Sequence, residues 1–230
     1  MIFTEKPGEN AMIECCVFDL DGTVLSTLET ITYHLNNTLV PEGLSALSVT
    51  DTQAIIGDGA RLLVERAVAL SREVGEDTFE RILTTYNQAY NSDPIPLTDY
   101  YQGIKELVDN LADAGVKLAV VTNKPEVTAK KLIGHFFPGK FDIVSGGRAG
   151  AVLKPDPAET LRVIAELGKT PAVTAFIGDT AVDIRTGKNV GAEISVGVSW
   201  GFRDRADLVA AGADVIVDTA EELLRVLGEK

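Results

Sequence analysis

The pattern of apolar and polar positions divides the chain into short apolar segments separated by longer helical ones. The short segments are rich in valine and isoleucine and lie at residues 13–20, 117–122, 141–145, 173–177, 193–198 and 215–217. Most lack polar alternation, which is typical of strands buried on both faces in a parallel sheet covered by helices. The segments between them have helical length and periodicity at residues 103–114, 125–136, 157–167 and 181–190. This alternation predicts an α/β fold, a doubly wound parallel sheet of the Rossmann-like kind.

The interval between the first two strands interrupts this rhythm because it contains no convincing strand. Apolar residues recur there at helical spacing, as at Leu28, Ile31 and Leu35. A crossover between parallel strands needs only one helix, so we expect residues 27–97 to form an inserted helical cap domain. Residues 1–26 and 98–230 would then form the α/β catalytic core domain. We interpret the tyrosines and leucines of the inserted helices as the core of that bundle.

Composition and charge restrict the classes of partner. The formal net charge is −13, which argues against nucleic-acid binding, where a basic surface is expected. No apolar run approaches the roughly 20 residues of a membrane span, and residues 1–12 do not resemble a secretory signal. We therefore expect a cytoplasmic protein, a monomer or a homodimer, with no membrane or nucleic-acid partner. An anionic substrate would have to be attracted locally, and a metal ion could do this.

Polar residues of a few types follow the predicted strands directly. Ligands of doubly wound sheets bind at the carboxyl ends of the strands, so these residues are candidates for one site. Any one of them could be only a helix cap, a turn former or a surface charge, but their joint placement favours a site. The candidates are Asp19, Asp21, Gly22, Thr23, Thr122, Asn123, Lys154, Asp179 and Asp183.

Four motifs that contain these residues resemble those of the haloacid dehalogenase-like hydrolase superfamily. They are FDLDGT at 18–23, VTN at 121–123, KPDP at 154–157 and GDTAVD at 178–183. Their order and spacing match, and the resemblance covers the chain from about residue 13. It implies a magnesium-dependent phosphatase, and the helical insert resembles the helical type of cap in that superfamily.

The resemblance also implies a role for each residue. Asp19 would attack phosphorus to give an aspartyl-phosphate, and Asp21 would protonate the leaving alcohol and then deprotonate water. Mg²⁺ would bind the Asp19 carboxylate, the Asp21 main-chain carbonyl and Asp179, with Asp183 supporting it directly or through water. Lys154 would neutralise Asp19 and the phosphoryl charge, and Thr122 would donate to a phosphate oxygen. Gly22, Thr23 and Asn123 are further candidates for substrate binding.

Other reactions remain open at this point. Asp21 favours phosphoryl transfer over dehalogenation, and the absence of lysine from residues 24–60 counts against a phosphonatase. A sugar phosphomutase of the superfamily remains possible, although its first motif usually ends in valine where this chain has Thr23. A phospho-receiver signalling domain would be about half this length and lack the insert, and a non-catalytic binding protein would not need the full set of motifs.

Within the superfamily the chain resembles the phosphoglycolate phosphatases most. The matching stretches are IGDGAR at 56–61, SGGR at 145–148 and VSWGFR at 198–203. The resemblance implies 2-phosphoglycolate as substrate, and free amides at 57–61 together with Arg61 could bind its carboxylate. A broad small phosphomonoester, nucleotide or pyrophosphate phosphatase is the alternative. The chain departs from that family at Ser26-Thr27, where an Asp-Ser or Asp-Thr pair is usual, which leaves the hinge open.

Overall fold

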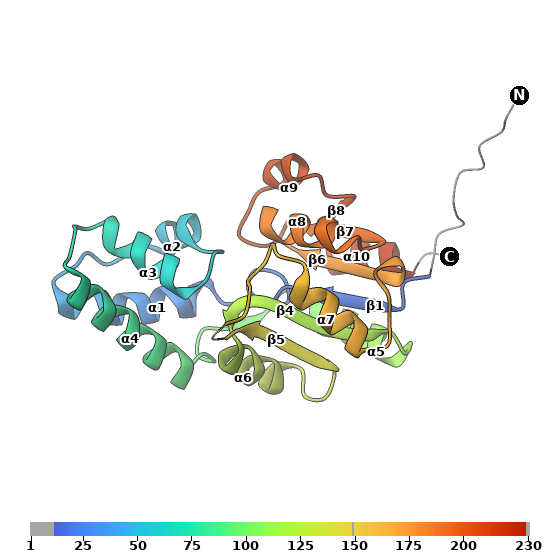
Figure 1. Cartoon of the computed structure of the whole chain (residues 1–230), viewed down its shortest axis with the longest axis horizontal. Helices are drawn as coiled ribbons and strands as arrows, with labels where there is room; N and C mark the ends of the chain where they lie inside the picture. The colour runs from blue at the N-terminus through green and yellow to red at the C-terminus, as the bar shows by residue number, and fades with distance from the viewer. Residues whose placement is uncertain (1–11, 149, 229–230) are drawn as a thin grey trace, which may run out of the picture.

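A sheet unit and a helical unit make up the molecule and lie side by side (Figure 1). The structure is a computed structural model that describes residues 12–148 and 150–228. Residues 1–11 and 229–230 of the predicted core domain, and residue 149 of the loop after the third predicted strand, lie outside the described residues.

The sheet unit has six parallel strands in the order β5-β4-β1-β6-β7-β8. The strands are β1 (Cys15–Phe18), β4 (Lys117–Pro125), β5 (Ile143–Gly147), β6 (Thr174–Gly178), β7 (Ile194–Val198) and β8 (Val215–Val217). Every predicted strand is present, and the predicted doubly wound α/β fold is confirmed. After β1 the chain builds outward through β4 and β5, then returns to the other side of β1 for β6 to β8. This reversal puts a topological switch point beside β1, where doubly wound sheets bind their ligands.

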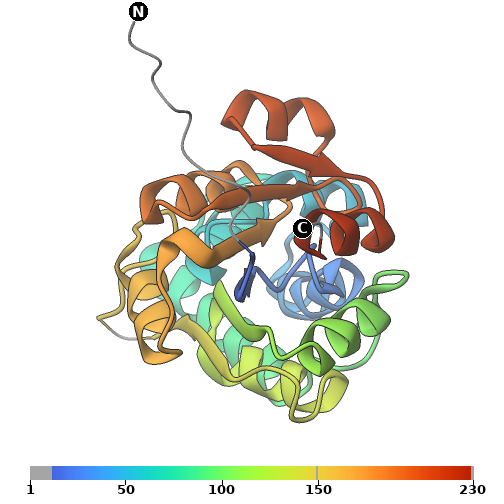
Figure 2. The same cartoon turned by 90° about the vertical axis from the view of Figure 1, so that its right-hand side faces the viewer.

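Alternate residues of each central strand pack against opposite helical layers. Cys16 and Phe18 of β1 belong to one apolar cluster, and Cys15 and Val17 belong to another. The first cluster includes side chains from α5 (Ile104–Asp113), α6 (Glu126–Phe136) and α10 (Ala220–Gly228). The second includes side chains from α7 (Ala158–Glu166) and α8 (Ala181–Val190). Both faces of the sheet are therefore covered, as Figure 2 shows from the end of the sheet unit, which explains the missing polar alternation.

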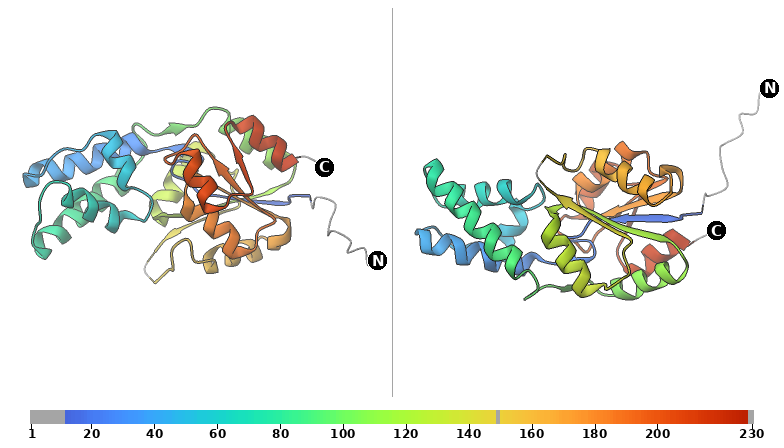
Figure 3. Two further views of the ribbon diagram at one scale, coloured as in Figure 1. Left: turned by 90° about the horizontal axis from the view of Figure 1, so that it is seen from above. Right: turned by 60° about the horizontal axis from the view of Figure 1, so that its bottom comes forward.

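The helical unit follows β1 and has an apolar cluster of its own. It contains α1 (Leu28–Leu39), α2 (Val49–Ile55), α3 (Ala60–Ala69) and α4 (Glu76–Ser92). Its helices stand beyond one end of the sheet in both views of Figure 3. A short antiparallel ladder joins the two crossings between the units, with β2 (Leu25–Ser26) paired to β3 (Asp99–Tyr100).

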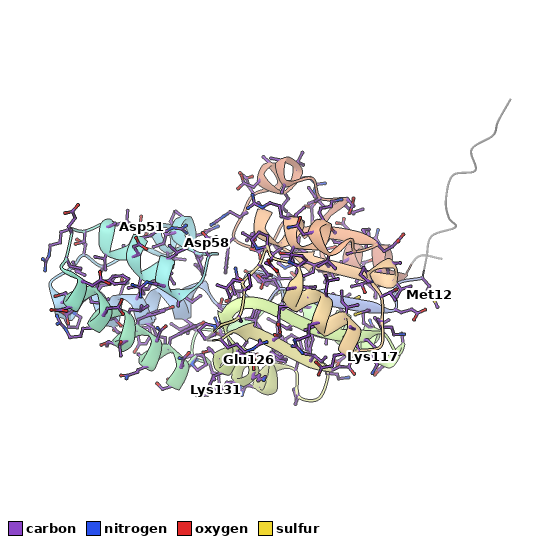
Figure 4. The ribbon with its side chains drawn as sticks, in the orientation of Figure 1. Met12, Asp51, Asp58, Lys117, Glu126 and Lys131 are labelled. Carbon is purple, nitrogen blue, oxygen red and sulfur yellow. The ribbon has the colours of Figure 1, made fainter. Side chains whose placement is uncertain are left out.

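Side-chain contacts also connect the two units directly. Lys131 of α6 donates from Nζ to the main-chain oxygen of Ser92, at the end of α4, where Figure 4 places the Lys131 side chain. Elsewhere in the sheet unit, α9 (Arg205–Ala211) follows the loop after β7. Within the described residues, none of the helices is both long and apolar enough to cross a membrane.

Candidate active site

A pocket lies between the carboxyl ends of the sheet strands and the helical unit. The sheet unit contributes mainly polar and charged side chains to it, and the helical unit contributes mainly apolar and aromatic ones. Its lining on the sheet side includes Asp19, Asp21, Thr122, Asn123, Lys124, Lys154, Thr180 and Asp183. The lining on the helical side includes Ile31, Ile56, Gly57, Gly59, Ala60, Leu63, Tyr86, Asn87 and Tyr90. Residues from strand ends far apart in the sequence thus meet at the switch point.

Lys154 bridges two carboxylates at the bottom of this pocket. Its Nζ lies 2.7 Å from Oδ1 of Asp19 and 2.7 Å from Oδ1 of Asp183. Burial lowers the pKa of Lys154, but the charges of Asp183 and Asp19 outweigh this effect and raise it overall. Lys154 therefore stays cationic beside Asp19.

Asp179 lies behind the pocket, next to Asp19, in a site shaped by small residues. Its Oδ1 accepts a hydrogen bond from Thr23 Oγ1 at 3.0 Å, and its Oδ2 accepts one from the main-chain nitrogen of Phe202 at 2.7 Å. A Cβ on Gly22 would lie 2.3 Å from Oδ2 of Asp179, and a Cβ on Gly201 would lie 2.4 Å from it. Gly22 also has φ +86°, so the backbone turn and the close approach both require glycine.

The carboxylates of Asp19, Asp179 and Asp183 form a buried acidic cluster that fits a divalent cation. One oxygen from each lies within 4.8 Å of the others. Oδ1 of Asp19 is buried and, although near Lys154, accepts no hydrogen bond. Burial raises the pKa of Asp19 to about 6, with Asp183 adding to the shift and Lys154 opposing it. Burial, and then the charges of Asp183 and Asp19, raise the pKa of Asp179 well above its ordinary value. A hard cation would relieve this repulsion.

Asp183 has a second function besides its place in the cluster. Its Oδ2 accepts hydrogen bonds from the main-chain nitrogen of Thr180 at 3.0 Å and from Thr180 Oγ1 at 2.6 Å. The bond from the Thr180 nitrogen, together with one from the Asp183 nitrogen to Thr180 Oγ1 at 3.4 Å, forms a capping box at the start of α8. Since its Oδ1 is held by Lys154, both oxygens of Asp183 already have protein partners.

Asp21 points toward the helical unit and is held by two side chains. Its Oδ1 accepts from Thr27 Oγ1 at 2.6 Å, and Lys124 Nζ lies 2.8 Å from Oδ1 and 3.0 Å from Oδ2. Lys124 Nζ also donates to the hydroxyl of Tyr90, from α4. Burial lowers the pKa of Lys124, while the charge of Asp21 opposes that effect.

Thr122 and Asn123, at the end of β4, have different surroundings. Thr122 Oγ1 accepts a hydrogen bond from the main-chain nitrogen of Lys124 at 3.2 Å, which leaves its own proton available for an acceptor in the pocket. Asn123 binds the main chain of Lys154 through both ends of its amide, at 2.8 Å to the nitrogen and 3.2 Å to the oxygen. Asn123 thus orients the lysine and also lines the pocket.

Arg61, predicted to bind substrate, lies outside the pocket lining. Its guanidinium pairs with Glu80 at 2.7 Å and stacks over Phe79, and more than half of the side chain is exposed. Gly57, Gly59 and Ala60, from the same stretch, do line the pocket. In this structure the start of α3 turns the Arg61 side chain toward α4, so a contact between Arg61 and substrate stays a prediction. Thr23 and Gly22 support Asp179 and do not line the pocket.

Sequence reasoning missed Lys124, Tyr90 and Phe202. Lys124 comes one residue after the VTN motif, so its position was visible, but nothing in the sequence pairs it with Asp21. Tyr90 was interpreted only as bundle core, whereas it belongs to the apolar cluster and lines the pocket as well. Phe202, from the loop after β7, is buried in the cluster of the helical unit.

Comparison with known proteins agrees with this geometry. Residues 16–196 match the model of a family described as haloacid dehalogenase-like hydrolase. The phosphoglycolate phosphatase of Agrobacterium fabrum is 33% identical over 220 residues, which covers 93% of this chain and 92% of that protein. The phosphoglycolate phosphatase of Rhodospirillum rubrum is 34% identical over 223 residues, covering 94% and 92% of the two chains.

Solved structures show the same fold. A candidate phosphoglycolate phosphatase from Lactobacillus delbrueckii subsp. bulgaricus superimposes with a TM-score of 0.87 at 32% identity, covering 95% of this chain and all of the other. A β-phosphoglucomutase from Clostridium difficile has a TM-score of 0.72 at 20% identity, covering 92% and 93% of the two chains, which shows the fold alone.

Proposed function

Because the chain belongs to the haloacid dehalogenase-like hydrolase family, we propose that it is a magnesium-dependent phosphatase whose preferred substrate is 2-phosphoglycolate. The relatives named above are phosphoglycolate phosphatases and match over nearly their whole length. The observation that carries the proposal is the arrangement around β1. Asp19 and Asp21 line one pocket, and Lys154 is paired with Asp19.

The reaction would proceed by two displacements on phosphorus. An oxygen of Asp19 attacks the phosphorus atom, and the bond from phosphorus to the ester oxygen breaks. Asp21 gives its proton to that departing oxygen, which leaves as an alcohol. A water molecule then attacks the aspartyl-phosphate and gives a proton to Asp21, so inorganic phosphate leaves and both carboxyl groups regain their starting states.

Lys154 and Thr122 would stabilise the transferring phosphoryl group. The ammonium of Lys154 lies against Asp19, and Thr122 has a hydroxyl proton free to donate. Such preorganised groups act where negative charge develops and need no rearrangement during the reaction.

The carboxylates of Asp19 and Asp179 and the main-chain carbonyl of Asp21 would hold Mg²⁺. Asp183 would support this site through Lys154 and Thr180, since both of its oxygens have those partners. When bound, Mg²⁺ supplies positive charge that offsets the repulsion between the phosphate and the carboxylates.

We extend the proposal to the arrangement of the molecule. Helices α1 to α4 form a cap over the site, with residues 27–97 as cap and residues 1–26 and 98–230 as core. The cytoplasmic location and the monomeric or homodimeric state predicted from the sequence stay predictions.

Turnover of a substrate panel with Mg²⁺ tests the proposal. The panel holds 2-phosphoglycolate, ethyl phosphate, glycerol phosphate, glucose phosphates, nucleoside monophosphates and pyrophosphate. We expect kcat/KM for 2-phosphoglycolate to exceed that for ethyl phosphate, which lacks the carboxylate, by about 10- to 150-fold, the effect of one charge-assisted contact. Equal values for the two esters would overturn the substrate assignment, and no phosphate release from any ester would overturn the phosphatase.

A further inference from the structure

Lys124 is a buried cation that the reaction described above does not use. Only 2% of its side chain is exposed, and its Nζ is held between the carboxylate of Asp21 and the hydroxyl of Tyr90. Burying an ammonium group is costly even when it is paired. A single pairing with Asp21 leaves open why the chain has a lysine, and not a neutral donor, at this position.

The charges in the pocket lining suggest what this lysine binds. Among the described residues that line the pocket, Lys124 and Lys154 are the two cations. Lys154 is already occupied by two carboxylates next to the phosphoryl position. The helical side of the lining is uncharged, and Arg61 points elsewhere. If a substrate carries a second anionic group besides its phosphate, Lys124 is therefore the cation of the pocket lining that can bind this group.

The position of Asp21 determines which part of a substrate lies beside Lys124. As general acid, Asp21 must contact the ester oxygen that leaves phosphorus. In 2-phosphoglycolate one methylene group separates this oxygen from the carboxylate. Lys124 Nζ is 2.8 Å from Asp21, so a carboxylate one carbon beyond the leaving oxygen falls within its reach.

We infer that Lys124 binds the carboxylate of the substrate and, with Tyr90, determines the preference for a carboxylate-bearing phosphomonoester. The inference rests on the proposed function and names the subsite of that same site. The hydroxyl of Tyr90 accepts from Lys124, so its own proton is free to donate to the carboxylate. Because Tyr90 lies on α4 and Lys124 on β4, the subsite forms across the cap and the core.

The test compares kcat/KM for 2-phosphoglycolate with that for ethyl phosphate in the full-length wild type and in Lys124→Met. We expect the variant to lose about 10- to 150-fold on 2-phosphoglycolate and clearly less on ethyl phosphate, so the ratio between the two substrates collapses. Equal losses on both substrates would overturn the inference, because they would mean that Lys124 acts only by positioning Asp21. Lys130→Met, in an exposed pair with Glu126 on α6, is the matched control and should keep the wild-type ratio.

A second variant decides the matter if Lys124→Met does not fold. Tyr90→Phe keeps the ring and its apolar contacts and removes only the hydroxyl. We expect it to lower the substrate ratio by about 2- to 12-fold, the effect of one neutral hydrogen bond. An unchanged ratio would overturn the inference.

The two proposals fail in different ways. If the wild type itself shows no preference for 2-phosphoglycolate, the substrate assignment fails before any variant is measured. If the wild type has the preference and either folded variant keeps it, only the carboxylate subsite of Lys124 and Tyr90 fails.

Discussion

At the scale of single residues, the site holds three buried carboxylates close together. One oxygen from each of Asp19, Asp179 and Asp183 lies within 4.8 Å of the others. Asp19 and Asp179 are buried, and the negative charges of their neighbours add to the cost of ionising them. Lys154 offsets part of this cost for Asp19. The residues proposed to perform the chemistry are therefore a source of instability in the metal-free protein.

This instability predicts a pH dependence that a variant can isolate. The folded-state pKa of Asp19 is about 6, above its ordinary value of 3.8. The folded state therefore binds this proton more tightly than the unfolded state. The contribution of Asp19 to the free energy of unfolding falls as pH rises through the folded-state pKa of about 6 and is lost by about pH 7.5. The Asp19→Asn variant lacks this contribution. In EDTA, its stability relative to wild type should improve by about 1 to 2 kcal/mol between about pH 5 and about pH 7.5. A constant difference in denaturant unfolding experiments would contradict the shift.

The sequence predicted which strand-end residues come together better than the direction of their side chains. Asp19 and Asp21 were identifiable because parallel strands bring their carboxyl ends to one edge, whatever the details of packing. The direction of Arg61 could not be predicted, because a residue near a helix start can face either way and α4 offers it Glu80. Lys124 was missed because its partner Asp21 lies 103 residues away along the chain.

At the scale of elements, the loop after β7 connects the cap to the acidic cluster. The main-chain nitrogen of Phe202 donates to Asp179, and its oxygen accepts from Gln53 of α2 at 2.7 Å. Arg203 donates to the main-chain oxygens of Gln53 and Ile56, both at 2.6 Å. One loop thus contacts Asp179 of the acidic cluster and helix α2 of the cap together.

Removing the side chain of Arg203 should weaken the attachment of the cap without altering the acidic cluster. In Arg203→Ala we expect KM for the substrate to rise and kcat to fall together, by about 3- to 10-fold each, because closure of the cap completes the site. Amide hydrogen exchange of α2 should be faster than in wild type. Arg205→Ala, which removes an exposed pair with Asp218, is the control. Unchanged exchange in α2 would show that Arg203 does not hold the cap.

The elements differ in how far the sequence could predict them. The strands and the long helices follow from periodicity, since each buries a regular apolar face. Helix α2 was not predicted, because it has only seven residues and one of them is buried. It begins with a capping box between Ser48 and Asp51, a local signal that is weak without a periodic apolar run. The contacts of Phe202 with the cap could not be predicted, because they join segments far apart in the chain and no local sequence pattern indicates them.

At the scale of the whole molecule, the net charge of −13 opposes the approach of an anionic substrate. Attraction must come from the pocket, where Lys154 pairs with the acidic cluster and Lys124 pairs with Asp21. A cation bound to the acidic cluster, as proposed, would change this balance, because it would neutralise charge where the phosphate is proposed to bind.

Mg²⁺ should therefore affect stability and activity together. At a concentration of about 100 times Kd it should stabilise the folded protein by about 2.7 kcal/mol, and Asp179→Asn should lose most of this gain. Turnover should vanish in excess EDTA. Ca²⁺ should inhibit, because it takes 6–8 ligands in looser geometry and would misplace Asp19 for attack. Full activity in excess chelator would contradict the metal assignment.

Transfer of the phosphoryl group to Asp19 is the central claim, and trapping the covalent intermediate tests it most directly. The Asp21→Asn variant lacks the base that activates water, whereas p-nitrophenyl phosphate has a leaving group that needs no proton. Acid quenching of this variant during turnover with Mg²⁺, followed by peptide mass spectrometry, should find phosphate on Asp19, and Asp19→Asn should carry none. Phosphate on another residue, or turnover by the Asp21→Asn variant with no covalent phosphate on Asp19, would contradict the mechanism.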